Sequence, residues 1–163
     1  MVVVIIGIVS AIAVPRMSST ASHASANALQ GTLMNVRTAI ECYFAEHNQF
    51  PGYDPSNGAP DGVQFVNQLT MYSDAKGNTS TARAAPFLYG PYLRKPFPSN
   101  QANNLATVHV KATRATPSPP DGSVGWVAVL ATGDFGVSAT DEQLENIGVS
   151  EDLGKAGARL QIN

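Results

Sequence analysis

The sequence predicts an α+β fold in which a long N-terminal helix packs its C-terminal half against a small antiparallel β-sheet. Three observations support this fold class. Residues 1–15 are uncharged and apolar in every direction around a helix, residues 29–44 carry apolar side chains at helical spacing, and residues 105–139 contain three strand-like segments separated by turns. We therefore expect one helix, followed by a compact head.

The apolar run forms the first part of this helix. A helix over residues 1–17 spans roughly 25 Å, slightly less than a hydrocarbon core. Because no side of it is polar, it has to be covered by lipid or by other subunits, since the remaining chain is too polar to surround it. The residues expected to make these membrane or filament-core contacts are Met1, Val4, Ile5, Ile8, Ala11, Ile12 and Val14.

The helix continues beyond the apolar run to about residue 48. Its second half has one apolar side, formed by Leu29, Leu33, Val36, Ile40 and Phe44 at spacings of four, three, four and four. Pro51-Gly52 ends it. Pro15 removes a backbone hydrogen bond and predicts a kink, and Gly7 is a second weak point. We divide the chain into a hydrophobic segment, 1–22, and a globular head, 23–163.

The head contains a second helix and three strands. Asp61 and Gln64 resemble a capping box that starts a helix over about 62–73, followed by a polar loop over 74–86. Strands are expected over 105–113, with His109 and Lys111 on the solvent side, and over 124–131 and 135–139. A tight hairpin at 132–134 joins the last two. The expected sheet is an antiparallel meander, and the expected head core is Leu33, Val36, Ile40, Phe44, Tyr92 and Trp126.

Two motifs resemble the type IV pilins and the major pseudopilins of type II secretion. Met1–Met17 is similar to their N-terminal helix, with Gly7, Ser10-Ala11 and Pro15 in matching order, and Tyr89–Pro98 contains a Gly-Pro-Tyr-Leu turn like that of major pseudopilins. The leader, the Phe-Thr-Leu-Ile segment and the buried Glu of the family are absent from the sequence, and we expect them upstream of Met1.

This resemblance implies a helical homopolymer held together by the N-terminal helix. The subunit would sit in the bacterial inner membrane before assembly, interact with a pilus or secretion assembly machinery, and end in a periplasmic or cell-surface filament. The family also implies that Gly7–Pro15 loses helicity on assembly. Major pseudopilins carry calcium in a C-terminal loop, which makes Asp134 and Asp141 the calcium candidates. No other cofactor is expected.

The sequence contains no pattern typical of an enzyme. It has no Ser-His-Asp set, zinc-ligand spacing, P-loop or dinucleotide fingerprint. Cys42 is the only cysteine, so no intramolecular disulfide forms, and its place in the helix predicts a small buried hydrophobe. A net charge of −2 does not indicate nucleic-acid binding.

Several alternatives remain open at this level. The apolar run also fits a signal peptide or an ordinary single-pass anchor, although no basic residue precedes it. A monomeric, membrane-anchored periplasmic binding or accessory protein is the main alternative to a filament subunit. Within the filament reading, a surface pilus and a short secretion pseudopilus predict the same sequence features.

Overall fold

The structure of the protein, a computed structural model, describes residues 2–116 and 118–149, with side chains described from Ala24 onward. It confirms the α+β class. The elements in chain order are α1 (Val2–His47), α2 (Gly62–Thr70), β1 (Tyr72–Ser73), β2 (Thr79–Ser80), β3 (Val108–Lys111), β4 (Trp126–Val129), β5 (Phe135–Val137) and α3 (Asp141–Asn146).

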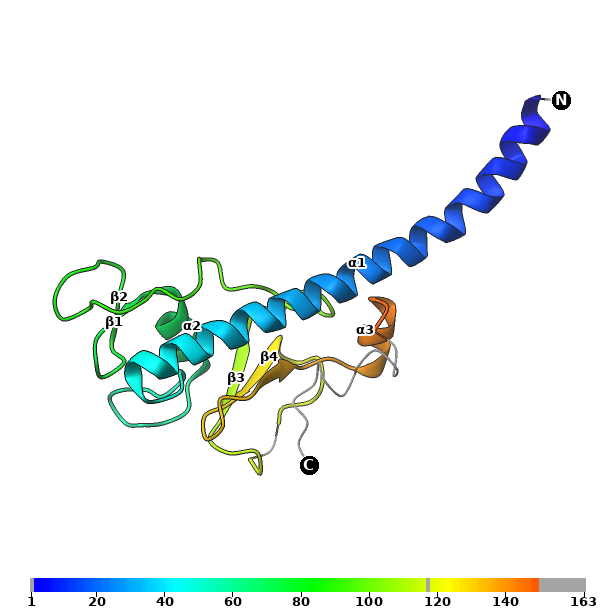
Figure 1. Cartoon of the computed structure of the whole chain (residues 1–163). Coiled ribbons are helices and arrows are strands. Elements are labelled where there is room, and N and C mark those ends of the chain that lie inside the picture. Colours follow the sequence, from blue (N-terminus) through cyan, green and yellow to red (C-terminus); the bar gives the residue numbers. More distant parts are fainter. Residues whose placement is uncertain (1, 117, 150–163) are drawn as a thin grey trace.

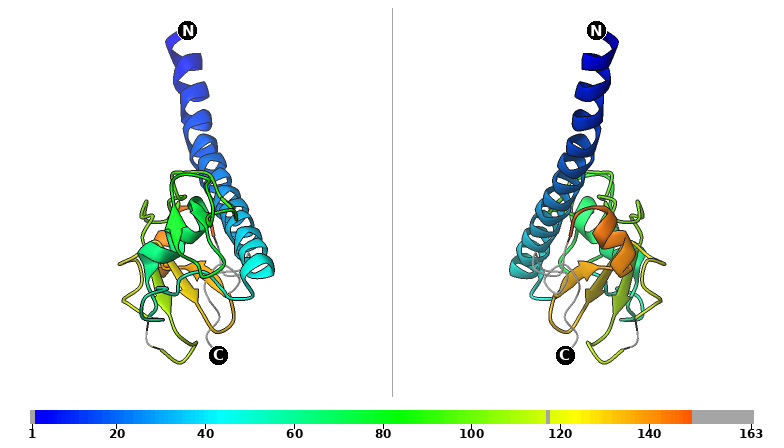
Figure 2. Two further views of the ribbon diagram at one scale, coloured as in Figure 1. Left: turned by 90° about the vertical axis from the view of Figure 1, so that its left-hand side faces the viewer. Right: turned by 90° about the vertical axis from the view of Figure 1, so that its right-hand side faces the viewer.

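Helix α1 is uninterrupted and runs through Gly7 and Pro15. Its first half extends away from the rest of the chain and its second half lies along the head (Figures 1 and 2). It ends at His47, as the position of Pro51-Gly52 predicts, and Asn48 follows it with a φ of 53°. After glycine, asparagine is the residue that most often ends a helix in this left-handed conformation. The Asn48 N–H donates to the Phe44 carbonyl over 2.7 Å.

The core lies between α1, α2 and the three-stranded sheet. The buried side of α1 includes Leu29, Leu33, Val36 and Ile40, none of them more than 3% exposed. Aromatic rings from the other layers meet there, since the Phe135 ring stacks on those of Trp126 and Phe65, with centroid separations of 5.2 and 5.8 Å. Burial of these apolar side chains at about 25 cal/mol per Å² stabilises the contact between α1 and the sheet.

The three-stranded sheet has the order β3-β4-β5, and one half of its predicted pairing is wrong. β4 and β5 form the predicted antiparallel hairpin, with Trp126 opposite Val137 and Gly133 in the turn at a φ of +70°. β3 and β4 are parallel, with Val108 opposite Trp126. Two parallel strands need a connection of a dozen or more residues, because the chain has to run back to the level at which the first strand began. The segment 112–125 between β3 and β4 is long enough for this.

The strands are shorter than predicted, and Lys111 is not on a solvent side. Only 1% of Lys111 is exposed, and its Nζ donates to the Arg114 carbonyl and to Ser118 Oγ, each over 3.1 Å. Burial lowers the pKa of this ammonium group. His109 is half-buried instead of solvated. The connection after β3 explains the burial of Lys111, because Arg114 and Ser118 lie over the end of its side chain.

Three further elements, β1, β2 and α3, were not predicted. The 74–86 segment was expected to be a loop, but β1 and β2 pair across a turn in which Asp74 Oδ1 accepts the N–H groups of Lys76 and Asn78. Helix α3 begins with a capping box between Thr140 and Gln143. For α2, the predicted cap at Asp61 is confirmed, but Gln64 Oε1 has no hydrogen-bond partner among the described residues, so the reciprocal bond of the box is missing.

Candidate interaction surfaces

The residues predicted to contact the membrane or the filament core belong to the first half of α1. The side chains of Met1, Val4, Ile5, Gly7, Ile8, Ala11, Ile12, Val14 and Pro15 lie outside the described side chains, so these predictions stay predictions. Among the described residues, no helix is both long and apolar enough to cross a membrane.

The predicted head-core residues fall into two groups. Leu33, Val36, Ile40 and Trp126 are buried, whereas Phe44 and Tyr92 are half-buried. Phe44 stacks on Phe50 at 4.4 Å between centroids, at the edge of the core. The neighbouring Tyr43 is only 3% exposed, so it takes the buried place that the four-residue spacing assigned to Phe44.

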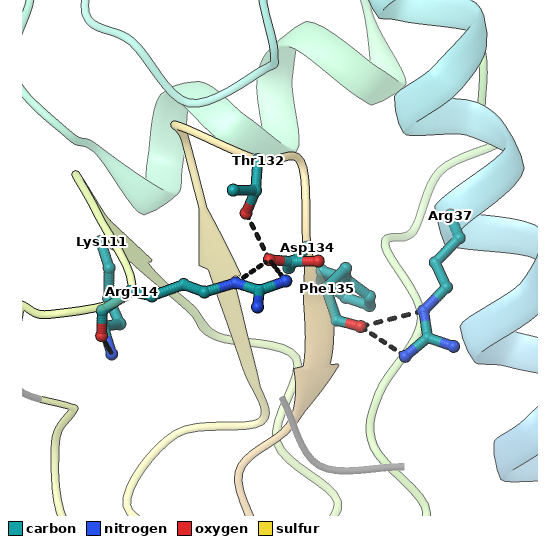
Figure 3. Close-up of polar contacts among 6 residues, drawn as sticks. All are labelled: Arg37, Lys111, Arg114, Thr132, Asp134 and Phe135. Carbon is teal, nitrogen blue, oxygen red and sulfur yellow. Dashed lines mark hydrogen bonds and ion pairs between the residues drawn. The ribbon is translucent and has the colours of Figure 1, made fainter. Parts of the chain in front are cut away.

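Helix α1 is attached to the sheet by one strong polar contact. Arg37 donates from Nε and Nη2 to the carbonyl of Phe135, over 3.0 and 2.7 Å (Figure 3). This contact acts together with the buried apolar side of α1, which packs against the head and sets the rotation of the helix. The side of α1 opposite the sheet therefore faces away from the head.

That opposite side of α1 is exposed and lined by small residues. Seven exposed residues recur at alternating spacings of four and three, as in a helix that packs on another helix: Ala24, Ala28, Gly31, Asn35, Thr38, Cys42 and Ala45. Met34, beside them, is 68% exposed. A Cβ added at Gly31 would meet nothing within 4 Å, so packing inside this chain does not require glycine there.

Cys42 belongs to this exposed side, and the prediction that it is buried is wrong. The reason is helical geometry. Cys42 follows the buried Ile40 by two positions, which at about 100° per residue places it on the far side of the helix. No disulfide is possible within the chain, as predicted from the single cysteine.

The calcium candidates do not form a recognisable metal site in the described residues. Asp134 Oδ2 is bound by Arg114 Nε and Nη2, over 2.7 and 2.6 Å, and also by the Thr132 hydroxyl (Figure 3). Asp141 lies in the first turn of α3. Within residues 2–116 and 118–149, no group of three or more His, Cys, Asp or Glu side chains could hold a metal ion. Asp134 instead connects the β4–β5 turn to the 112–125 connection.

A cluster of polar aromatic residues lies where α1 ends. The His47 ring packs against Tyr43 and Tyr89, at 4.0 and 4.9 Å between centroids. His47 Nε2 lies 3.0 Å from Ser73 Oγ and 3.3 Å from the Tyr92 hydroxyl. His47 Nδ1 is buried without a hydrogen-bond partner among the described residues. Local sequence patterns do not predict this cluster, because nothing local connects Ser73 with a residue 26 positions earlier.

Electrostatics in this cluster favour the neutral imidazole. Burial lowers the pKa of His47, and this effect exceeds the opposing influence of the Glu46 and Asp74 carboxylates. The Tyr92 hydroxyl donates to Glu46, and burial together with this carboxylate raises the pKa of Tyr92. The cluster therefore holds the end of α1, β1 and the Tyr89–Tyr92 segment together without a charged histidine.

A shallow apolar groove of about 470 Å³ lies between α2 and β3. Val63, Val66 and Val108 line it, with Asp61 at the α2 end. Val63 is 69% exposed. β3, which forms one wall of the groove, is an edge strand of its sheet. The small-residue side of α1 and this groove are the two surfaces of the described chain that are best suited to binding.

Comparison with protein-family models, curated proteins and solved structures finds no match to this chain, so the resemblance to pilins and pseudopilins rests on its sequence motifs alone.

Proposed function

We propose that this chain is a structural subunit that polymerises into a helical filament of the type IV pilus or secretion pseudopilus kind. Its N-terminal helix would anchor it in the bacterial inner membrane, where an assembly machinery would take it up, and would pack in the filament core afterwards. The proposed subunit is a pilin-like lollipop that acts by assembly and not by catalysis. The finished filament would be periplasmic or on the cell surface.

The observation that carries this proposal is the asymmetry of α1. Over its second half, one side is buried on the head while the opposite side presents only small or polar residues and Met34 to the exterior. Small residues allow the backbones of two helices to approach closely, and the resulting van der Waals contacts favour association of the helices. Residues 1–15, which are uncharged, supply apolar surface that a single copy cannot cover.

A charged substitution in the first half of α1 tests the proposal. We expect Ile8→Lys to abolish filaments, because a lysine in an apolar helix bundle is left without a partner for its charge. The measurement is electron microscopy of the shear-released and inner-membrane fractions of producing cells, with mass spectrometry to identify the subunit. Ile8→Leu is the matched control. Normal filaments from Ile8→Lys would refute the packing, provided that protease resistance shows the head to be folded in both variants.

The α2–β3 groove favours a second candidate function, that of a monomeric, membrane-anchored binding or accessory protein. Such a protein stays monomeric in detergent and never appears in the shear-released fraction. Light scattering of the purified full-length chain in detergent, together with fractionation of producing cells, distinguishes the two functions.

A further inference from the structure

The α2–β3 groove is an apolar surface without an occupant among the described residues. Val63, Val66 and Val108 contribute apolar side chains to it, and Val63 is one of the three large apolar residues of the described chain that are strongly exposed. The other two are Met34 and Leu88, exposed by 68% and 56%. Exposed apolar surfaces of this kind commonly mark a contact with another protein.

The exposed side chain of Leu88 has the properties of a knob that could fill this groove. The residues on both sides of it are tied by backbone hydrogen bonds, because the Phe87 N–H donates to the Ala84 carbonyl over 2.7 Å and the Tyr89 N–H donates to the Ser73 carbonyl over 3.1 Å. Its side chain therefore projects from a backbone that is already ordered. A contact made by such a residue costs little conformational entropy on association.

The knob and the groove lie at opposite ends of α2. The segment after Leu88 is fixed to the C-terminal end of α2, where the Leu69 carbonyl accepts the N–H groups of Tyr92 and Leu93 over 2.9 and 2.8 Å. The groove lies at the N-terminal end, beside Asp61 and Val63. Leu88 therefore does not fill the groove of its own subunit. The Leu88 side chain of a neighbouring subunit in the filament can fill it.

Charge also pairs these two surfaces. Three basic residues within seven positions of Leu88 in the sequence are exposed: Arg83, Arg94 and Lys95. The two carboxylates beside this segment already have partners, since Glu46 accepts from the Tyr92 hydroxyl and Asp74 accepts from the N–H groups of its own turn. Asp61 places a carboxylate at the groove. Opposite charges around an apolar contact favour one orientation of the partner. Met34 lies on the exposed side of α1, which the proposed function already uses for helix packing.

We propose that Leu88 of one copy inserts into the α2–β3 groove of the next copy in the filament, with the basic residues near Leu88 facing Asp61. The two surfaces are different, so the contact is head-to-tail and repeats without closing on itself. This inference rests on the proposed function, because it specifies one of the contacts between heads in the same filament.

Cysteine cross-linking tests the contact. Cys42 is kept, because it lies on the side of α1 assigned to helix packing, and the unsubstituted chain is the background control. Leu88→Cys and Val63→Cys are introduced together and separately, and filaments are oxidised and run on a non-reducing denaturing gel. Both positions are exposed, so neither change removes a core side chain. We expect the double variant to give a ladder of covalent oligomers, because each copy carries both partners. Each single variant is expected to give no ladder.

The outcomes separate this inference from the proposed function. Filaments of the double variant without a ladder would overturn the Leu88 contact and leave the filament intact as a function. If the unsubstituted chain itself forms no filaments, the proposed function fails and the contact fails with it. As an independent measurement, Leu88→Asp should reduce filament yield about tenfold or more, since it sets a carboxylate against the apolar groove and against Asp61. An unchanged yield would contradict the contact.

Discussion

His47 is the residue with the most unusual surroundings in the described chain. Three tyrosine rings, from α1 and from the Tyr89–Tyr92 segment, lie around its imidazole, and β1 provides the Ser73 hydroxyl. The charged groups nearby are Glu46 and Asp74. Because Nδ1 is buried without an acceptor, a second proton on the ring would leave a buried donor unsatisfied.

The first prediction follows from the lowered pKa of His47. A histidine whose pKa in the folded state lies below its ordinary value of 6.5 favours folding when neutral. Its contribution to the free energy of unfolding is complete above the unfolded pKa and is lost as pH falls through 6.5 towards the folded value. Thermal melts of the full-length chain in detergent should show this loss, and His47→Gln should show less of it.

The control for this experiment is His109→Gln. Burial and Lys111 also lower the pKa of His109, but this residue is far from the end of α1 in sequence and lies on β3. The His109→Gln variant should therefore keep the part of the pH dependence that His47 produces. An NMR titration in which His47 has a midpoint at or above 6.5 would contradict the assignment.

At the scale of the elements, α1 serves two partners with two sides. One side is covered by the sheet and by α2, and Arg37 holds that side in register through the Phe135 carbonyl. The other side carries small residues, and among them Gly31 costs helix stability relative to alanine. Nothing lies within 4 Å of the position its Cβ would occupy, so packing in the single chain does not require glycine there.

The second prediction is that Gly31→Ala separates the stability of the subunit from its assembly. Alanine in a helix interior is favoured over glycine by about 1 kcal/mol, so the monomer should become more stable to heat. Filament yield should fall, because a methyl group at the closest approach separates the helices. Gln30→Ala, on the adjacent exposed surface, is the control that alters helix propensity without enlarging the small-residue side. Unchanged filament yield in Gly31→Ala would remove this side of α1 from the assembly contacts.

At the scale of the whole molecule, Trp126 joins the layers. It is fully buried on β4, its ring stacks on that of Phe135, and its Nε1 donates to the Pro98 carbonyl over 3.0 Å. Pro98 ends the segment that contains the Gly-Pro-Tyr-Leu turn. One side chain therefore connects the central strand, the hairpin and the segment that precedes β3.

The third prediction is a graded loss of stability at this position. Trp126→Ala should cost about 3–5 kcal/mol, because it leaves a cavity at the centre of the head. Trp126→Phe should cost less, since it keeps most of the volume and loses the hydrogen bond to Pro98. Chemical denaturation of the full-length chain in detergent measures both. Equal losses for the two variants would mean that the hydrogen bond, and not the filled volume, carries the contribution of Trp126.

The sequence by itself determined the features that depend on neighbouring residues. The length of α1 follows from its apolar spacing and from Pro51-Gly52, the start of α2 from the Asp61 cap, and the β4–β5 hairpin from Thr132-Gly-Asp134 between two apolar strands. Each of these signals acts within a few residues. The α+β class follows from the same signals, since it needs only the types of the elements and their order.

Only the tertiary structure decided which distant segments meet. The parallel pairing of β3 with β4 depends on the path of residues 112–125, which no local pattern specifies. The gathering of His47, Ser73 and Tyr92 depends on that kind of long-range contact too. The groove arises in the same way, because Val63 and Val108 become neighbours only when α2 packs beside β3. Strand order and binding surfaces are set by packing between segments far apart in sequence, and periodicity reports only on each segment by itself.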